Sequence, residues 1–343
     1  MPNIIHTTKK NKIQAIIIIV VFLCIYIAGM VSVLLFMQNR AKIDVTDFDP
    51  SLMDAAIRPA GDKLTGIYIP EETDKDGQID LAIQLINTAN YNLQHDNKVA
   101  YAVNSNTVVM GVATGGIRYY IKNGNEFFNA DYFYVPQGGA GTIAKKMDPK
   151  NTNYGYRMYY NLSTHVGYEQ KSTELSFEKD IFGNIKFGVD WDILLFENKI
   201  EEIPAEFAAS SKAYRYYNYD WTKESILTAS VTYNADEGYY EMVVTIDAEN
   251  EEAIKDGLEV LRAGAGDESA VYTSITETVQ IWDNGRYKQF NTYDKWKSPN
   301  IHGLHISTSS ANDYKTTFYY DDYSLNIKNY QYSNEFIEYI ENK

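Results

Sequence analysis

Hydrophobic positions follow three successive patterns along the 343 residues of the chain. The first is an apolar run from Ile13 to Met37 that contains no charged side chain. A helical repeat follows at residues 78–95, and most of the remaining chain consists of short stretches in which Val, Ile and aromatic residues alternate with polar ones. This order predicts one long apolar helix followed by a domain that is mainly β-sheet with a few helices.

The apolar run predicts an uncleaved signal anchor. A helix over Ile13–Met37 would extend about 37 Å, and the hydrocarbon core of a bilayer is about 30 Å thick. Bulky and polar residues follow the run, without the small residues of a signal-peptidase site. A long signal peptide that is removed near Gly29 or Ser32 is the alternative. Three lysines precede the run and two basic residues follow it, which favours a cytoplasmic N-terminus.

These signals predict a single-pass protein of the cell membrane, with the membrane as its first partner. The N-terminal tail comprises residues 1–12, and the transmembrane anchor comprises residues 13–37. A polar stalk or linker follows at 38–75, where three prolines interrupt the chain. The remainder, 76–343, is predicted to be an extracytoplasmic domain, because long domains are translocated largely regardless of their own charge.

Helical spacing predicts two amphipathic helices packed on a sheet, and a short helix from Ser333. The first helix covers 78–95, with an apolar stripe of Ile79, Ala82, Ile83, Ile86 and Leu93. The second covers 249–264 and is expected to end at Gly264. Its stripe consists of Ile254, Leu258 and Leu261.

Turn residues between alternating stretches predict antiparallel hairpins. Asn123-Gly124 and Asn284-Gly285 each lie between aromatic runs and fit a type I′ turn, in which both central residues need positive φ. A further hairpin is expected around Gly238. Its strands have alternating apolar positions, predicted to face one side of the sheet, at Leu227, Ala229, Val231 and Tyr233 and at Tyr240, Met242, Val244 and Ile246.

The predicted class is α+β, a large antiparallel sheet with two packed helices. Helix, strands and an Asn-Gly hairpin recur, so that 76–200 and 201–343 are either duplicated halves or independent parts of one sheet. The element order over roughly 76–330 resembles the LolA-type envelope lipoprotein-carrier domains, in which a curved sheet wraps around helices. This resemblance implies an apolar cavity that accepts acyl chains, and it transfers no individual residue.

Composition excludes one class of partner and indicates a location. The chain has a net charge of −15, and without its first 42 residues it carries 26 Lys and Arg against 46 Asp and Glu, a net charge of −20. Such a domain repels phosphate backbones, so we expect no nucleic-acid binding. The only cysteine, Cys24, lies within the apolar run, and the outer domain must fold without disulfides. Abundant Asn, Ile, Lys and Tyr favour a bacterial envelope of Gram-positive type.

The acidic stretch "ETDKDGQID" resembles a calcium-binding loop. Oxygen ligands at the expected spacing would come from Glu72, Asp74, Asp76, Gln78 and Asp80. The bidentate carboxylate of the last loop position is missing, because Ile83 stands there. The favoured interpretation is therefore an acidic turn that caps the following helix, with no cofactor, and a weak Ca²⁺ site is the alternative.

A second acidic motif, "VDWDI", places Asp190 and Asp192 on the same face of a strand. Paired carboxylates at about 5–9.5 Å carry out glycoside hydrolysis. Alternation explains the motif more simply, with Trp191 and its apolar neighbours facing the core and the two aspartates facing water.

The expected function is accordingly non-catalytic binding or a structural role at the cell envelope. The candidate partners are an apolar ligand such as a lipid held between sheet and helices, a wall glycan stacked on tyrosines, or another envelope protein. The alternative is an envelope glycan hydrolase that uses a carboxylate pair.

Overall fold

The computed structural model describes the greater part of the domain that follows the predicted anchor. The described residues are 57–109, 112–134, 154–172, 175–179, 185–189, 196–200, 219–299, 308–330 and 333–342. The predicted tail at 1–12, the predicted span at 13–37 and the first part of the predicted stalk lie outside them. Within the ranges given above, none of the helices is both long and apolar enough to cross a membrane.

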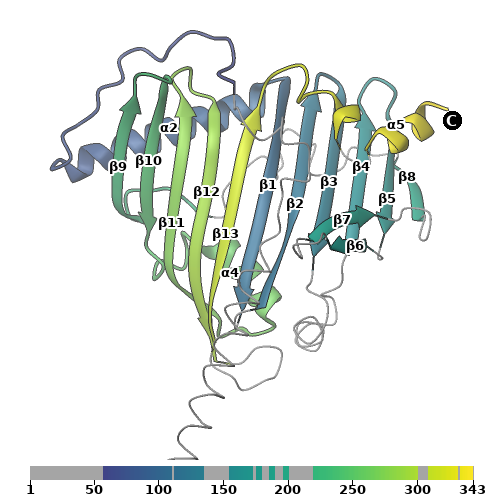
Figure 1. The fold of residues 1–343 in the computed structure, drawn as a ribbon. Coiled ribbons are helices and arrows are strands. Elements are labelled where there is room, and N and C mark those ends of the chain that lie inside the picture. Colours follow the sequence, from purple (N-terminus) through teal and green to yellow (C-terminus); the bar gives the residue numbers. More distant parts are fainter. Residues whose placement is uncertain are drawn as a thin grey trace, which may run out of the picture.

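A single antiparallel sheet of eleven strands dominates the fold, in the order β8-β5-β4-β3-β2-β1-β13-β12-β11-β10-β9 (Figure 1). The strands of the first half are β1 (Lys98–Val109), β2 (Val112–Asn123), β3 (Glu126–Tyr134), β4 (Tyr154–Asn161), β5 (Val166–Ser172) and β8 (Phe196–Ile200). Those of the second half are β9 (Ile226–Asn234), β10 (Tyr239–Ile246), β11 (Val271–Trp282), β12 (Tyr287–Ser298) and β13 (Thr308–Tyr319). A separate pair consists of β6 (Leu175–Lys179) and β7 (Ile185–Val189).

One strand pair joins the two halves of the chain. β1 is antiparallel to β13, with Ala100 opposite Tyr319 and Val109 opposite Ser310. Both halves therefore belong to the same sheet. Whether they arose by duplication remains a prediction.

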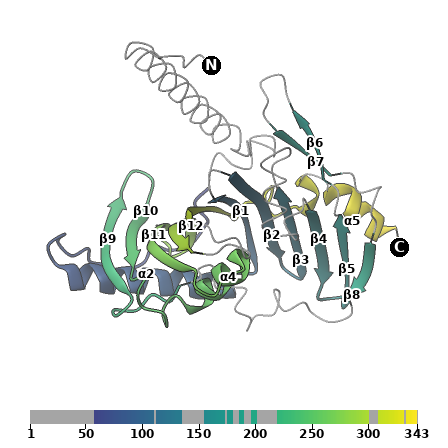
Figure 2. The same ribbon diagram turned by 90° about the horizontal axis from the view of Figure 1, so that it is seen from below.

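Two helices cover one face of this sheet, which we call the inner face. Helix α2 (Lys75–His95) and helix α4 (Lys255–Ala265) pack on the same side of β9–β12, and Figure 2 shows both helices in a view from the ends of the strands. Their apolar stripes match the predicted ones, because Ile86, Leu258 and Leu261 are buried in the same cluster as the inward side chains of β10–β12. The second half thus has the alternation of a sheet with one face buried.

The opposite, outer face has a separate cover over the strands of the first half. The 3-10 helix η5 (Ile327–Asn329) and helix α5 (Ser333–Glu341) lie in front of the sheet in Figure 1, whereas α2 lies behind it. Phe336 and Ile337 of α5 are buried against outward side chains such as Ile117 and Phe128. Strands β1–β4 therefore bury much of their outer face, and part of their inner face also joins the inner cluster, through residues such as Tyr101 and Tyr120.

The predicted hairpins are present, but the turns at Asn123-Gly124 and Asn284-Gly285 are not of the predicted type I′. In each turn only the glycine has positive φ, since His165 is the only non-glycine residue with positive φ in the described part of the chain. Gly124 has φ of +64°, Gly238 has φ of +76° and Gly285 has φ of +80°, and each lies in the turn between two paired strands. This part of the left-handed region favours glycine because a side chain there meets the backbone. The predicted α+β class is confirmed in the form of a large antiparallel sheet with a few helices.

The sequence prediction is wrong about one side chain of β9 and about the two ends of α4. Leu227 is 56% exposed and Ile226 is buried in its place, because a register shift opposite Thr245 and Ile246 skips Leu227. Helix α4 begins at Lys255 rather than 249, after turns, and its left-handed C-cap is Gly266 rather than Gly264. The predicted short helix from Ser333 is confirmed as α5, and it adds a cover on the face opposite the two predicted packed helices.

Residues that precede α2, within the predicted linker, contact the sheet domain. Arg58 Nε is 2.6 Å from Asp283 Oδ1, and Lys63 Nζ is 2.9 Å from Asp283 Oδ2. The Leu64 amide also donates a 2.7 Å hydrogen bond to the carbonyl of Asp283. Burial raises the pKa of Asp283, but hydrogen bonds from Lys63 and Arg58 outweigh it, so the carboxyl has a lowered pKa. The chain is thus held against the β11–β12 turn.

Candidate functional site

The inner face carries carboxyl groups where the strand pattern calls for apolar side chains. Glu277 of β11 lies between the inward positions Ile275 and Val279, and it is fully buried. Asp294 of β12 shares the inner face with Phe290 and is 1% exposed. Their strands are paired so that Glu277 lies opposite Thr292, which makes Glu277 and Asp294 diagonal neighbours about 7–8 Å apart.

The Glu277 carboxyl receives hydrogen bonds from the protein itself. Trp221 Nε1 donates to Oε2, and Thr292 Oγ1 lies 3.3 Å from Oε1. Burial raises the pKa of Glu277 to about 8, because desolvation penalises the charged carboxylate more than these two donors favour it, and the nearby Asp294 carboxyl raises the pKa further. Glu277 is therefore mostly protonated at neutral pH.

Asp294 has a similar environment. Asn312 Nδ2 donates a 2.7 Å hydrogen bond to Oδ1, and the Tyr219 hydroxyl lies 3.2 Å from Oδ2. Burial raises the pKa of Asp294 to about 7, against the opposing effect of both donors. Burial also raises the pKa of Tyr219 well above its ordinary value, so its hydroxyl keeps its proton. The two carboxyls can hold protons, but their oxygens already bind side chains of this chain.

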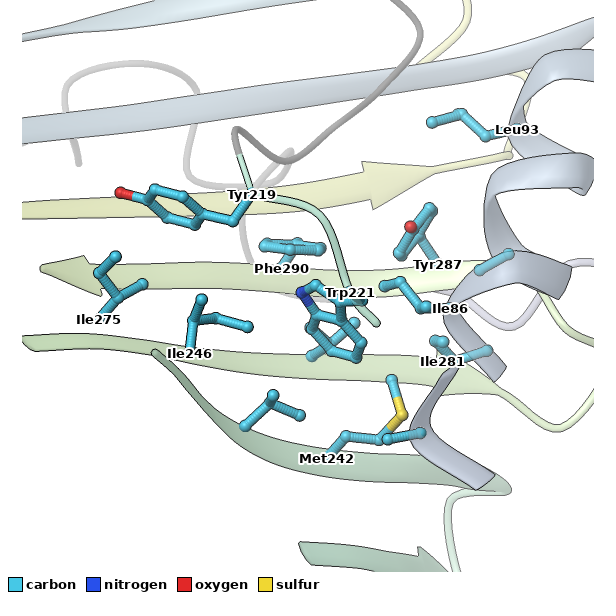
Figure 3. Packing of buried hydrophobic residues seen from close by; sticks show 14 of the residues in the cluster. Ile86, Leu93, Tyr219, Trp221, Met242, Ile246, Ile275, Ile281, Tyr287 and Phe290 are labelled. Atoms are coloured by element: carbon cyan, nitrogen blue, oxygen red, sulfur yellow. The ribbon is translucent and has the colours of Figure 1, made fainter. Parts of the chain in front are cut away.

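Tyr219 and Trp221 belong to the short segment that precedes β9. Its backbone is fixed by the Asp220 amide, which donates a 2.8 Å hydrogen bond to the carbonyl of Ala253. Figure 3 shows Trp221 between Phe290 and Met242, with Ile86 of α2 close by. The space between α2 and strands β9–β12 is thus occupied by the protein's own side chains, and the carboxyls fix this segment to the sheet.

Across the sheet, the inner face changes from apolar and buried to polar and exposed along a single line of paired residues, which we call the transverse row. Each member lies directly opposite the next on the neighbouring strand. The row runs from β9 to β5 through Val231, Met242, Val279, Phe290, Thr316, Val103, Arg118, Asp131, Tyr156 and Lys171. Its first four members are at most 3% exposed.

The last four members of the row are polar and reach solvent. The side chain of Arg118 is 55% exposed, and its Nη2 is 2.7 Å from Asp131 Oδ2. The Tyr156 hydroxyl lies 3.3 Å from Glu169 Oε2, and Lys171 Nζ lies 5.3 Å from the centre of the Tyr156 ring. Neighbouring strands are about 4.8 Å apart, so this part of the row spans about 14 Å. It offers both charges and an aromatic ring to a polar ligand.

The residues of the calcium-like stretch make separate contacts. Asp74 caps α2 by accepting a 3.0 Å hydrogen bond from the Gly77 amide. Gln78 is buried, with Nε2 2.7 Å from the Pro70 carbonyl and Oε1 2.7 Å from the Val231 amide. Asp80 forms an ion pair with Lys223 at 2.5 Å. Glu72 and Asp76 are exposed, and the Gln78 oxygen points away from the acidic turn.

The structure brings together other carboxyls than those the sequence suggested. Asp190 and Asp192 lie outside the described residues. Among the residues that are described, no three His, Cys, Asp or Glu side chains surround a common point suited to a metal ion. Glu277 and Asp294 were not identified from the sequence. Each of them occupies an inward position in a strand whose other inward positions are mostly apolar, and this interruption is the signal by which they could have been found.

Comparison with solved structures yields distant structural likeness. No family model matches the chain, and no curated protein matches it. Among solved structures, a DUF1329 family protein from Desulfovibrio piger ATCC 29098 is similar over 76% of this chain and 98% of its own, with 10% sequence identity and a TM-score of 0.18. A likeness this weak carries no argument about fold or function, and the LolA-type resemblance remains a prediction.

Proposed function

We propose that the protein is a membrane-anchored, extracytoplasmic binding protein of a bacterial cell envelope. In this proposal the apolar run at 13–37 remains in the membrane, and the sheet domain holds a polar ligand such as a wall glycan on the inner face of β2–β5. The supporting observation is the transverse row. Its members from Val231 on β9 to Phe290 on β12 are apolar and buried, whereas its members from Arg118 on β2 to Lys171 on β5 are polar and accessible to solvent.

The packing at the other end of the row argues for this position of the ligand. Phe290 is 1% exposed, and Trp221 fills the space beneath α2. An acyl chain placed there would have to displace well-packed aromatic side chains, which costs several kcal/mol. The face from Arg118 to Lys171 requires no such rearrangement, since an aromatic ring flanked by charges can contact a sugar directly.

Sedimentation with purified, insoluble bacterial cell wall tests the proposal. The full-length chain in neutral detergent micelles should sediment with the wall. Arg118→Gln and Tyr156→Ala should each weaken retention by about tenfold or more, which corresponds to about 1.4 kcal/mol. Lys98→Gln, which removes an exposed cation at the end of the same sheet, is the matched control and should bind like the wild type.

Two results would contradict the proposal. One is a wild-type chain that stays in the supernatant. The other is equal retention of all four proteins, since retention would then owe nothing to the transverse row.

A glycan hydrolase that uses a carboxylate pair is the second candidate. It is favoured by the buried carboxyls of Glu277 and Asp294, which are diagonal neighbours on β11 and β12 and whose pKa values burial raises to about 8 and about 7, because glycosidases use a pair of carboxyl groups. Hydrolysis of the same wall material, lost in both Glu277→Gln and Asp294→Asn while each variant stays folded, would support this candidate. Unchanged sugar release from these variants, or no release by the wild type, would remove it.

A further inference from the structure

The outer face of the second half is a broad surface that no described helix covers. Helices α2 and α4 lie on the inner side of these strands, and α5 with η5 covers only the outer side of β1–β4. Outward positions on β11 are hydroxyl or amide residues, namely Ser274, Thr276, Thr278 and Gln280. On β1 the corresponding outward residues include Asn104 and Asn106. This face is therefore polar and mostly uncharged.

A line of lysines runs through the middle of this face, and we call it the outer lysine track. Its members are Tyr293, Lys295 and Lys297 on β12 and Asp313 and Lys315 on β13. Asp313 lies directly opposite Tyr293, which makes Lys315 a diagonal neighbour of Tyr293. From the level of Lys315 to Lys297 the track extends about 20 Å along the strands.

The charges of the track are not neutralised by the described parts of the chain. All three lysines and Asp313 are exposed, and within the described ranges no ion pair engages any of them. The Lys295 ammonium lies 5.7 Å from the centre of the Tyr293 ring, which is 44% exposed. Three lysines and one aspartate give the track a net charge of +2, on a chain whose net charge is −15.

We propose that the outer lysine track binds an anionic glycan that lies along β12 and β13. The argument is charge complementarity, because a polyanion is repelled by the chain as a whole and attracted at this face. A linear polymer can use several cations spaced along a strand, while the Tyr293 ring and the surrounding hydroxyl and amide groups can contact sugars. This site lies on the face opposite the transverse row and is independent of the ligand proposed there.

The surroundings of the track favour a glycan over a lipid surface. The outward residues next to it are Thr276, Asn291 and Asn106, and the large apolar side chains that would enter a bilayer interface are not among them. The anion itself can be a phosphodiester or a carboxylate, since a lysine ammonium binds either one as a point charge.

Binding of labelled polymers to the full-length chain in neutral detergent micelles tests the inference. The probes are poly(glycerol phosphate), polygalacturonate and neutral dextran, together with vesicles of phosphatidylglycerol. We expect binding of at least one of the two polyanions, and the one that binds identifies phosphate or carboxylate as the anion. This binding should weaken with salt and fall about tenfold or more in Lys295→Gln/Lys315→Gln. Tyr293→Ala should weaken it at high salt as well.

The matched control is Lys75→Gln/Lys255→Gln, which removes two exposed lysines at the starts of α2 and α4. It should bind like the wild type. The inference is overturned if neither polyanion binds, if dextran binds equally well, if only the vesicles bind, or if both double variants lose binding to the same extent. Arg118→Gln should leave polyanion binding unchanged, so failure of the inner-face proposal and failure of this one are separable.

Discussion

The two halves of the sheet bury their faces differently. Among the residues that the structure describes, helices cover strands β9–β12 on the inner face alone, and the outer face of these strands carries Thr, Asn and Lys side chains. Strands β1–β4 are covered by α5 on the outer face, while part of their inner face also joins the core, through Tyr101 and Tyr120. Strands β9–β12 can therefore present a polar surface on their outer face. Strands β2–β5 present the polar end of the transverse row on their inner face.

This difference indicates how a single sheet can offer two separate binding faces. A helix that lies on one side of a strand leaves the other side to solvent, and α2 and α5 lie on opposite sides of different strands. The accessible face thus changes sides between β12 and β2. The carboxyls of Glu277 and Asp294 lie in the closed half, where they hold Trp221 and Tyr219.

The largest effect is expected from truncating the transverse row in its closed half. Phe290→Ala removes a ring that is 1% exposed and should lower the free energy of unfolding by about 3–5 kcal/mol. Tyr156→Ala, in the same row but at its accessible end, should cost about 1 kcal/mol. Urea unfolding in detergent, followed by tryptophan fluorescence, measures both. Equal costs would mean that the two ends of the row are packed alike.

A slightly smaller effect is expected for the outer cover. Phe336→Ala on α5 removes a ring that is 1% exposed and lies 4.7 Å from the Arg157 guanidinium, and it should cost about 2–4 kcal/mol. Tyr339→Ala is the control on the same helix, because Tyr339 is 46% exposed. Its cost should stay below about 1 kcal/mol. If Phe336→Ala is as mild as the control, α5 does not stabilise the outer face of β1–β4.

The smallest effect, taken per pH unit, concerns the buried carboxyls. The pKa of Glu277 is about 8 when folded and near 4.5 when unfolded, so between these values only the folded state keeps the proton. Below about pH 4.5 the carboxyl is protonated in both states, and the stabilising effect of its retained proton is fully present. As the pH rises from there toward 8, the free energy of unfolding falls by up to about 1.4 kcal/mol per pH unit.

Glu277→Gln should remove this slope, so that its stability relative to the wild type rises between pH 5 and pH 8 by up to about 1.4 kcal/mol per pH unit. Asp294→Asn should act in the same direction, with its change ending near pH 7. Urea titrations at pH 5, 6, 7 and 8 measure the effect. Identical slopes in wild type and Glu277→Gln would show that the buried carboxyl is ionised.

The sequence predicted the second half better than the first, for a physical reason. In β10 and β11 one face is buried, so apolar positions such as Met242, Val244 and Val279 alternate with polar ones. In the first part of β1 and the paired last part of β2 both faces are buried, and the consecutive buried residues Val99–Ala102 and Tyr119–Ile121 contain no alternation to read. Helix α5 could be located in the sequence, but nothing local indicated which face it covers.

The site was less accessible to sequence reasoning than the fold. The transverse row depends on the pairing of β1 with β13, whose residues are more than 200 positions apart in the chain. No local pattern fixes that pairing, so Arg118 and Phe290 could not be placed on one line. Leu227 was misplaced because a one-residue register shift reverses which side chains face inward.

Protease protection on cells that express the full-length chain with a C-terminal tag tests the central claim most directly. The claim is that residues 13–37 stay in the membrane and hold the sheet domain outside it. We expect protease added to intact, wall-stripped cells to remove the tag while a cytoplasmic marker survives, and the untreated protein to remain with the membranes after alkaline washing. A tag that is protected until the cells are lysed, or a soluble protein whose mature chain begins near residue 30, would contradict the account.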